Sequence, residues 1–391
     1  MPYNINGNLC NIKGGDNIHY LDNAATTKVD DAVIQKITNV LKENFGNPSS
    51  LYSLGMQSEI VIKNARQTIA NALKCDRNSI YFTSCGTESN NIALLGAISS
   101  RTKWADNVIC TGFEHPSVEK PLANCNMQLK IIPPNKNGIV DVNSIIDAVN
   151  SKTALVSVMH VNNEIGTIQD VVKIAELVKQ KNLRTAVHVD GIQAFLKLPI
   201  DLKKSKIDTY SLSGHKVHAP KGIGALYIRS GYNISPPFLG GGQEKGIRSG
   251  TENIAYIAGF AKAVELLHPN ISSNYKKACE LITYLKNSLE NFNNIKINSP
   301  LTEKCSPYIF NFSCVGYKSE VLLHYLEDFG IYVSSGSACS KGKGSHTLVA
   351  MGLENNIIDS SLRIGISNET TIEDINIFIK YLDEGLKKLA H

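Results

Sequence analysis

The sequence lacks the features that would mark it as a membrane, secreted or nucleic-acid-binding protein. No apolar run among its 391 residues approaches the 18 residues that a membrane span needs, and the first 20 residues carry no signal-peptide core and no arginine-rich amphipathic pattern. The 40 lysines and arginines exceed the 35 aspartates and glutamates by five and form no basic block. We therefore expect a cytoplasmic protein that binds neither a membrane nor, directly, a nucleic acid.

Paired cysteines and a dinucleotide-binding motif are also missing. The nine cysteines are scattered without a C-x-x-C motif, so we expect no metal site, no disulfide framework and a reducing compartment. No G-x-G-x-x-G follows a predicted strand in the first half of the chain, which disfavours a Rossmann dehydrogenase. The hydrophobic fraction of 42% and the mean hydropathy of -0.11 indicate a globular protein of two or three domains.

Short apolar runs alternate with longer helix-period segments from about residue 79 onward. The runs rich in Val, Ile and Tyr predict strands at 79–84, 107–111, 129–133, 154–161, 185–190, 208–213 and 224–229. The other segments predict helices at 31–44, 53–73, 88–100, 116–126, 142–150 and 171–181. This order predicts an α/β fold whose large domain has a mostly parallel central sheet flanked by helices.

The last third of the chain has a different pattern. A long helical stretch at 254–291 precedes predicted strands at 309–314, 331–334 and 361–366 and predicted helices at 319–329 and 372–388. We interpret this part as a smaller α+β domain. The predicted organisation is an N-terminal segment (1–19), a large domain (20–257) and a small C-terminal domain (258–391).

Two residues at predicted strand ends suggest a cofactor. Asp190 ends the strand at 185–190, where parallel sheets bind ligands, and a buried acid there needs a cationic partner. Lys216 follows the strand at 208–213 and precedes a loop rich in glycine and proline. Alone, Lys216 is most simply a solvated loop residue, and a capping or surface role is the less favoured interpretation of Asp190. Together they match the aspartate on the ring nitrogen and the Schiff-base lysine of pyridoxal phosphate enzymes.

The phosphate of such a cofactor needs backbone N–H groups at the start of a helix. Gly86 and Thr87 form a turn of this kind between the first predicted strand of the sheet and the helix that follows it. A Gly-Thr turn is common by itself. Its place in a sheet that also carries Asp190 and Lys216 makes the prediction of a phosphate site much stronger.

Ten segments carry a resemblance to a known family. In chain order they are LDNAATT, FGNPSS, FTSCGTESNN, EHPSV, MHVNNEIG, HVDGIQ, SGHKVHAPKGIGALY, GGGQEKGIRSGT, SSGSACS and SLRIG. The chain resembles the NifS/IscS-like cysteine desulfurases of the class V aminotransferase family, from about residue 20 to about residue 389. The resemblance implies the pyridoxal-phosphate-dependent fold type I, with the cofactor bound by the large domain. The chain departs from the usual family pattern in having a cysteine, Cys85, before Gly86.

The resemblance implies roles around the cofactor ring. Lys216 would bind pyridoxal 5'-phosphate as a Schiff base, and Asp190 would pair with the ring nitrogen. Gln193 would bond the phenolic oxygen. His115 would stack on the ring and help to move protons.

The resemblance also implies how the phosphate and the substrate are bound. Gly86, Thr87, Ser213 and His215 would hold the phosphate. Thr251 would reach the phosphate of the neighbouring subunit, so a homodimer is implied. Asn163 would lie beside the cofactor and the substrate, and Arg363 would clamp the substrate carboxylate through a bidentate guanidinium pair.

Cys339, in SSGSACSKGKGSH, matches the nucleophile of the family. Lys341 and Lys343 beside it favour the thiolate, the reactive form of a cysteine. The resemblance implies that Cys339 takes sulfur from L-cysteine as a persulfide, leaving L-alanine. The sulfur would then pass to an acceptor protein in iron–sulfur cluster assembly or in a thiolation pathway.

Two kinds of alternative remain open. A selenocysteine lyase or an aminotransferase of the same fold would share the cofactor residues, but transamination needs no nucleophile, so a Cys339 variant would separate them. A non-catalytic sulfur carrier or scaffold subunit would keep only the fold. The complete set of Lys216, Asp190, His115, Cys339 and Arg363 argues against it. We therefore predict a pyridoxal-phosphate-dependent enzyme, a cysteine desulfurase.

Overall fold

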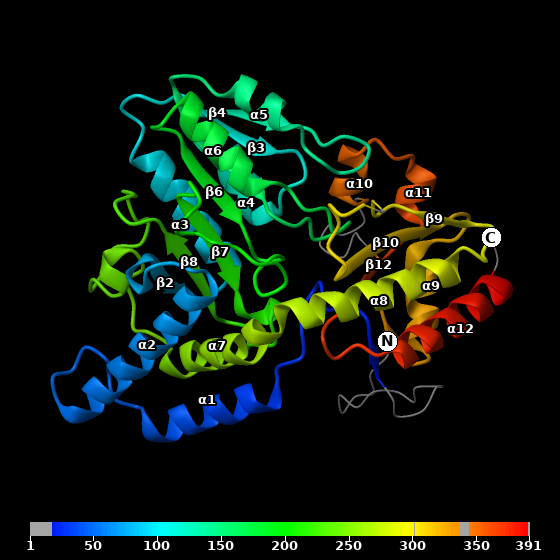
Figure 1. Ribbon diagram of the computed structural model, residues 1–391, viewed down its shortest axis with the longest axis horizontal. Helices are drawn as coiled ribbons and strands as arrows, with labels where there is room; N and C mark the ends of the chain where they lie inside the picture. The colour runs from blue at the N-terminus through cyan, green and yellow to red at the C-terminus, as the bar shows by residue number, and fades with distance from the viewer. Residues whose placement is uncertain (1–17, 301, 336–343, 390–391) are drawn as a thin grey trace.

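The computed structural model describes residues 18–300, 302–335 and 344–389. Figure 1 shows two lobes, a larger one around the strands labelled β2 to β8 and a smaller one around β9, β10 and β12. Cys339 lies outside the described residues, so its predicted role stays a prediction.

A seven-stranded sheet forms the centre of the larger lobe. In spatial order its strands are β2 (Ile80–Thr83), β8 (Gly224–Ile228), β7 (Thr209–Ser213), β6 (Ala186–Asp190), β5 (Thr153–Met159), β3 (Asn107–Thr111) and β4 (Gln128–Ile132). Neighbouring strands from β7 to β4 are parallel, whereas β8 runs antiparallel to both its neighbours. Each strand lies within two residues of its predicted bounds, and the predicted α/β fold class is confirmed.

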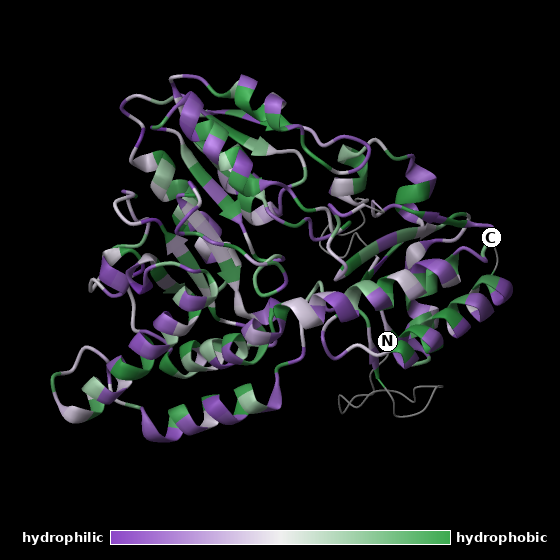
Figure 2. Cartoon of the chain, in the orientation of Figure 1, coloured by the Kyte–Doolittle hydropathy of each residue, from purple (hydrophilic) through white to green (hydrophobic). Residues whose placement is uncertain are grey.

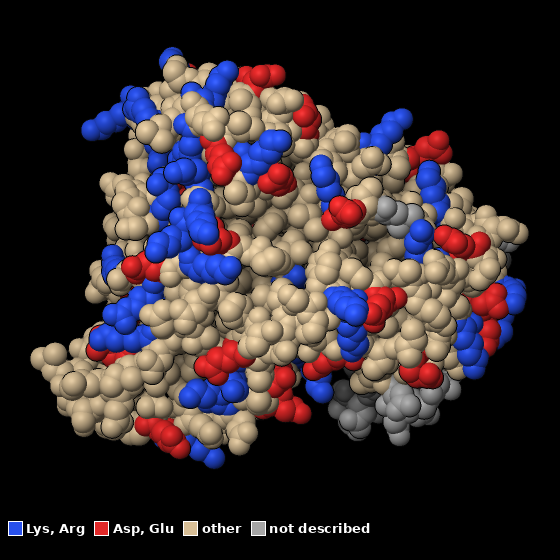
Figure 3. Space-filling view, in the orientation of Figure 1, with Lys and Arg blue, Asp and Glu red and all other residues tan. Residues whose placement is uncertain are grey.

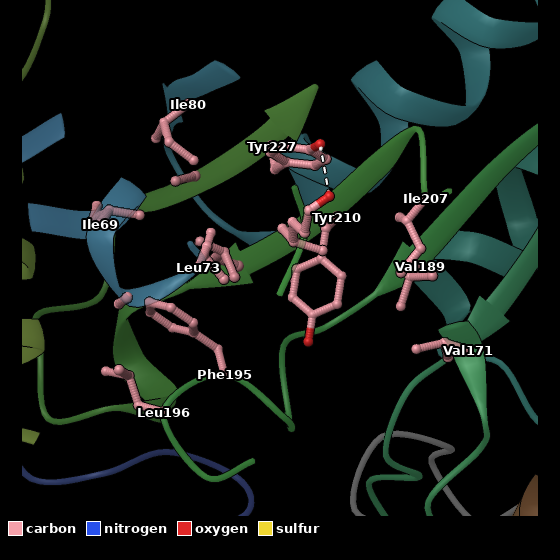
Figure 4. Close-up of a cluster of buried hydrophobic side chains, with 14 of the residues drawn as sticks. Ile69, Leu73, Ile80, Val171, Val189, Phe195, Leu196, Ile207, Tyr210 and Tyr227 are labelled. Carbon is pink, nitrogen blue, oxygen red and sulfur yellow. Dashed lines mark hydrogen bonds between the residues drawn. The ribbon is translucent and has the colours of Figure 1, made fainter. Parts of the chain in front are cut away.

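Side chains alternate along the strands between two buried faces. On one face, Val156, Val158, Tyr210 and their neighbours form a core that Figure 4 shows in part. The helices that contribute to this core are α2 (Ser53–Ala72), α5 (Val142–Ala148), α6 (Val171–Lys181) and α7 (Ile254–Leu267). On the other face, Leu155 and Cys110 pack with α3 (Gly86–Ser99) and α4 (Pro116–Ala123). Burial on both faces explains why the strands read as continuous apolar runs.

The smaller lobe is an antiparallel sheet with helices on it. Strand β10 (Ile309–Cys314) lies between β12 (Ser361–Gly365) and β9 (Ile295–Ile297). Phe312 of β10 meets Phe378 edge to face, with ring centroids 6.3 Å apart. The helices of this lobe are α8 (Ile271–Leu289), α9 (Ser319–Glu327) and α12 (Ile372–Lys388). Along α8 and α12, hydrophobic and hydrophilic residues alternate (Figure 2), as expected for helices with one buried face.

Several short elements of this lobe were not expected from the sequence. They are β9, α10 (His346–Ala350), α11 (Asn355–Asp359) and β1 (His19–Tyr20). Strand β1 pairs in parallel with β11 (Ile331–Tyr332), and Leu21 lies in the core of the smaller lobe. The start of the described chain therefore packs with its last third. The chain crosses to the larger lobe only afterwards, where α1 (Asp31–Glu43) packs against α7.

The helical stretch predicted at 254–291 is two helices. A 3₁₀ turn, His268–Asn270, separates α7 from α8, and its Pro269 cannot donate a backbone hydrogen bond. Buried side chains of α7 belong to the core of the larger lobe, whereas those of α8 belong to the core of the smaller lobe. The predicted domain boundary at 257/258 stays a prediction, and this packing favours a division at the turn.

Two surface properties bear on the predicted partners. Within the described part of the chain, none of the helices combines the length and the apolar character that crossing a bilayer requires. Lysine and arginine side chains gather on the surface beside α6 (Figure 3), where two adjoining hollows are lined by Arg101, Lys179, Arg184, Lys206 and Arg229. Buried Asp208 pairs with two of these cations, Lys179 and Arg229. The expected absence of direct nucleic-acid binding stays a prediction.

Candidate active site

A cavity of about 360 Å³ lies at the carboxyl ends of β6 and β7 and is lined by residues of both lobes. It brings together most of the predicted site residues, namely Gly86, Thr87, His115, Asn163, Asp190, Gln193, Ser213, His215, Lys216 and Arg363. Thr251 does not line this cavity; it is exposed before α7. Cys339 lies outside the described residues.

Lys216 projects into the cavity from a tight turn after β7. Strand β7 ends at Ser213, and the 3₁₀ turn Gly214–Lys216 follows it directly. A Cβ atom at Gly214 would lie 2.7 Å from the Cγ2 atom of Ile223, so only glycine fits there. The Nζ atom of Lys216 donates to the carbonyl oxygens of Ala24 and Ala25, each at 2.7 Å. The segment after β1 therefore forms one wall of the site.

Asp190 is a buried carboxylate without a charged partner among the described residues. Asp190 is only 3% exposed. Its Oδ1 accepts from the backbone N–H of Ile192 at 3.0 Å, and its Oδ2 accepts from Nδ2 of Asn90 at 2.9 Å. These donors are neutral, and each carboxylate oxygen can accept a further bond. A protonated ring nitrogen would supply the cation that this carboxylate lacks.

His115 is held in one tautomer. It is the N-cap of α4, and its Nδ1 accepts from the backbone N–H of Ser117 at 3.1 Å. Burial lowers the pKa of His115, and Lys216 acts in the same direction against an opposing effect of Asp190. The neutral ring therefore carries its proton on Nε2. In this state His115 can donate a proton but is a poor base at Nε2.

The turn before α3 has the features of a phosphate site. The N-cap residue Cys85 makes no side-chain capping bond, so the first N–H groups of α3 have no partner from it. A Cβ atom at Gly86 would lie 2.2 Å from the Cδ1 atom of Ile192, so the close approach needs glycine. Ser213 lines the same cavity, and its buried Oγ atom has no hydrogen-bond partner among the residues that the structure describes. An anion here would satisfy both groups.

His215 borders the same turn. Burial lowers the pKa of His215 to about 4, with the charge of Lys216 the next contribution. The ring is therefore neutral near pH 7, and it would bind a phosphate as a hydrogen-bond donor. Its Nδ1 lies 3.2 Å from Oγ1 of Thr26.

Arg363 of β12 brings a cation from the smaller lobe. Its Nη1 donates to the carbonyl oxygen of Asn163 at 2.9 Å, and its Nη2 donates to Oδ1 of Asp22 at 2.8 Å. Its Nε is buried and has no partner within the described part of the chain. These contacts fix the plane of the guanidinium group and leave a donor for a substrate carboxylate.

Glu114 and Glu164 are among the acidic residues of the cavity that were not expected from the sequence. Glu114 accepts from the backbone N–H of Met159 at 2.8 Å and from the hydroxyl of Thr111, and burial raises its pKa to about 8. Its place shortly after the end of β3 was the available signal, since Asp190 has an equivalent place at β6. Glu164 accepts from the hydroxyls of Ser345 and, at 2.9 Å, Thr347, so it ties the larger lobe to α10.

A comparison with known families identifies the class of this fold and site. The model of the aminotransferase class-V family matches residues 19–378 of the chain. The protein therefore belongs to the class-V aminotransferase family, and pyridoxal phosphate, the predicted cofactor, is confirmed.

The similar proteins narrow this class. The chain is 37% identical over 376 residues to the cysteine desulfurase IscS of Clostridium botulinum, covering 94% of each chain. It is 38% identical over 379 residues to a cysteine desulfurase of Nostoc, covering 95% of this chain and 93% of the relative. A solved structure of a NifS-like protein superimposes with a TM-score of 0.90 at 36% identity, over 95% of this chain and 100% of the other. A structure titled SspA in complex with cysteine has a TM-score of 0.79 at 29% identity, over 90% and 99%. The predicted resemblance to the cysteine desulfurases is confirmed.

Proposed function

We propose that this protein is a cysteine desulfurase, which converts L-cysteine to L-alanine and carries the sulfur as a persulfide. The main support for this proposal is that Lys216 and Arg363 line the same cavity. A lysine that forms a Schiff base and a guanidinium group that binds a carboxylate together select an α-amino acid. The names of the relatives, and the structure described as a complex with cysteine, support cysteine as that amino acid.

The bound cofactor would supply an electron sink for the bonds at the substrate Cα. Asp190 would keep the ring nitrogen protonated, and the unpartnered Ser213 hydroxyl would bind the phosphate. Lys216 or His115 would take the proton from Cα. The tautomer of His115 favours Lys216 as this base and His115 as a proton donor, because Nδ1 of His115 already accepts from Ser117.

The transfer of sulfur would depend on Cys339, which the sequence predicts to be the nucleophile. Its thiolate would attack the substrate sulfur, forming an S–S bond while the bond between sulfur and substrate Cβ breaks. One cysteine and one protein thiol then give one alanine and one protein persulfide, so atoms and electrons balance. No external oxidant or reductant is required.

Mass spectrometry and an alanine assay test this proposal together. After L-cysteine, the peptide containing Cys339 should gain one sulfur atom, and Cys339→Ser should release almost no alanine while still binding the cofactor. Cys279→Ser is the matched control, since Cys279 is partly buried in α8 and should not affect turnover. Alanine release by Cys339→Ser at the wild-type rate would show that another group accepts the sulfur. Conversion of L-cysteine to its keto acid without alanine would indicate transamination.

We also propose that the active form is a homodimer. Thr251 is exposed and outside the cavity of its own chain, which suits a residue that completes the site of a neighbouring subunit. Large apolar side chains are exposed on and between α1 and α2, among them Leu41, Phe45 and Leu51 at 62%, 71% and 95%. Such a patch is typical of a covered interface.

The sulfur acceptor is proposed only by class. It would be a protein thiol in iron–sulfur cluster assembly or a thiolation pathway, as the name IscS suggests for the relatives. Seven described cysteines are free, which supports a reducing compartment such as the cytoplasm. Identification of the protein that receives labelled sulfur in a cell extract would decide between the pathways.

A further inference from the structure

Lys197 is a buried lysine beside the active site to which the proposed function gives no role. It lies four residues after Gln193 in the turn that follows β6, and it is only 9% exposed. Its Nζ donates to Oε1 of Gln193 at 3.1 Å and lies 5.7 Å from the ring centroid of Tyr308. Among the described residues no carboxylate pairs with it. A buried ammonium group without an ion pair is costly, so a compensating role is expected.

The contact with Lys197 determines which end of the Gln193 amide faces the cavity. An ammonium group has donors only, so it must meet the oxygen and not the nitrogen of the amide. The nitrogen end of the Gln193 amide is consistent with this orientation, because Nε2 donates to the carbonyl oxygen of Ala24 at 2.9 Å. The second N–H of Nε2 is then left for the cavity, which Gln193 lines. This is the orientation that a bond to the phenolic oxygen of the cofactor requires.

In its protonated form, Lys197 also places a positive charge close to the catalytic lysine. The carbonyl oxygen of Ala24 accepts from both Gln193 and Lys216, so one amide and one carbonyl group connect the two ammonium groups. Burial lowers the pKa of Lys197 to about 7, and the like charges of Lys216 and Arg363 act in the same direction. The other titratable groups that face it are His215, His218 and Tyr308. None of them supplies a negative charge near pH 7.

We propose that Lys197 is a positioning residue for the cofactor, which orients the Gln193 amide and adds positive charge behind that amide, on the side away from the cavity. This inference rests on the proposed function only in assuming that the cofactor binds in this cavity. A donor from Gln193 and a positive charge behind that amide both favour the more negative, deprotonated form of the bound chromophore. They therefore lower the pH at which its visible absorbance changes.

A pH titration of the visible absorbance of the holoenzyme tests the proposal without measuring turnover. In Lys197→Met, which keeps an apolar stem, the midpoint should rise by about one pH unit. Lys197→Arg keeps the charge and the donors, so its midpoint should stay near the wild-type value. Lys179→Met is the matched control, because Lys179 is also a buried lysine but pairs with Asp208 at 2.6 Å, away from the cavity.

A midpoint that is unchanged or lowered in Lys197→Met would overturn the proposal, as would an equal rise in Lys179→Met. If Lys197→Met does not fold or bind the cofactor, Lys197→Gln gives the answer. It keeps a donor for Gln193 but loses the charge, and an unchanged midpoint there also counts against the proposal. A shifted midpoint in a protein that makes no alanine would refute the proposed function and leave this inference standing.

Discussion

Nδ2 of Asn90 donates to Oδ2 of Asp190 over 2.9 Å, although the two residues lie 100 positions apart on α3 and β6. The other end of the Asn90 amide accepts from Nε2 of His188 at 3.1 Å. Burial lowers the pKa of His188 to about 3, so its ring is neutral and donates from one nitrogen only. The side-chain amide of Asn90 is therefore fixed from both ends, and it fixes the carboxylate of Asp190.

Replacing Asn90 should weaken cofactor binding before it affects any chemical step. Asn90→Ala removes one buried hydrogen-bond partner from each of Asp190 and His188, which should lower the free energy of unfolding by about 1–3 kcal/mol. Because the Asp190 carboxylate is then held, among the described residues, only by the backbone N–H of Ile192, the dissociation constant for pyridoxal phosphate should rise roughly tenfold or more. Equilibrium dialysis measures this constant. Asn107→Ala is the control, since Asn107 is also a buried asparagine but lies at the start of β3.

Glu114 should make stability depend on pH in a defined direction. Burial raises the pKa of Glu114 from the ordinary value of 4.5 to about 8. The folded protein therefore keeps a proton that the unfolded chain loses. The free energy of unfolding should therefore fall as pH rises from about 4.5 towards 8, by about 1 kcal/mol per pH unit. Glu114→Gln should lose this contribution and gain stability relative to wild type as the pH rises.

Urea unfolding at pH 5 and pH 8 measures the effect of Glu114→Gln. Glu176→Gln on the exposed face of α6 serves as the control and should show the wild-type pH dependence. A constant difference between wild type and Glu114→Gln at the two pH values would show that Glu114 is ionised in the folded protein.

Arg363→Lys should affect substrate binding most. A lysine keeps the charge but loses the planar pair of donors, so we expect the KM for L-cysteine to rise about tenfold to a hundredfold. The visible spectrum of the cofactor without substrate should stay as in wild type, because the group removed faces the substrate. Steady-state kinetics and the absorbance spectrum give the two readouts. A changed KM together with a changed spectrum would place Arg363 at the cofactor instead.

The apolar surface of α1 and α2 should control oligomeric state. Leu51→Asp with Phe45→Asp should turn the proposed dimer into a monomer, because charged residues in a covered apolar interface are strongly unfavourable. Sedimentation velocity measures the result, and the activity should fall with the dimer if Thr251 completes the neighbouring site. Leu183→Asp is the matched control, since Leu183 is 78% exposed but lies beyond α6. Fully active monomers would contradict the shared site.

The sequence predicts the elements best where one local signal decides them. The helix α6 has its predicted bounds because its apolar period is regular and Asp170 caps it. The single helix predicted at 254–291 is interrupted at Pro269. The apolar period on both sides of this proline predicts one continuous helix, and the break is visible only in the structure. Strand β9 has three residues, which is too short for a periodic pattern to identify.

The same distinction applies to the site. Asp190 ends β6 and Lys216 follows β7, so the sequence alone predicts that both lie at one edge of the sheet. Asn90 and Lys197 lie within a helix and a turn, where an amide or an ammonium group has no expected partner. Their contacts, with Asp190 and with Gln193, depend on how α3 and the β6 turn pack. Only the tertiary structure shows them.

The pairing of β1 with β11 has a consequence for synthesis of the chain. Residues 19–20 leave the ribosome more than 300 residues before their partners at 331–332. Leu21 lies in the core of the smaller lobe with Phe312 and Leu362, which are also synthesised far later than Leu21. Since the carbonyl oxygens of Ala24 and Ala25 accept hydrogen bonds from Lys216, this early segment also forms a wall of the active site. We expect a nascent chain released before β11 to expose this segment to chaperones and proteases, and to hold no complete site.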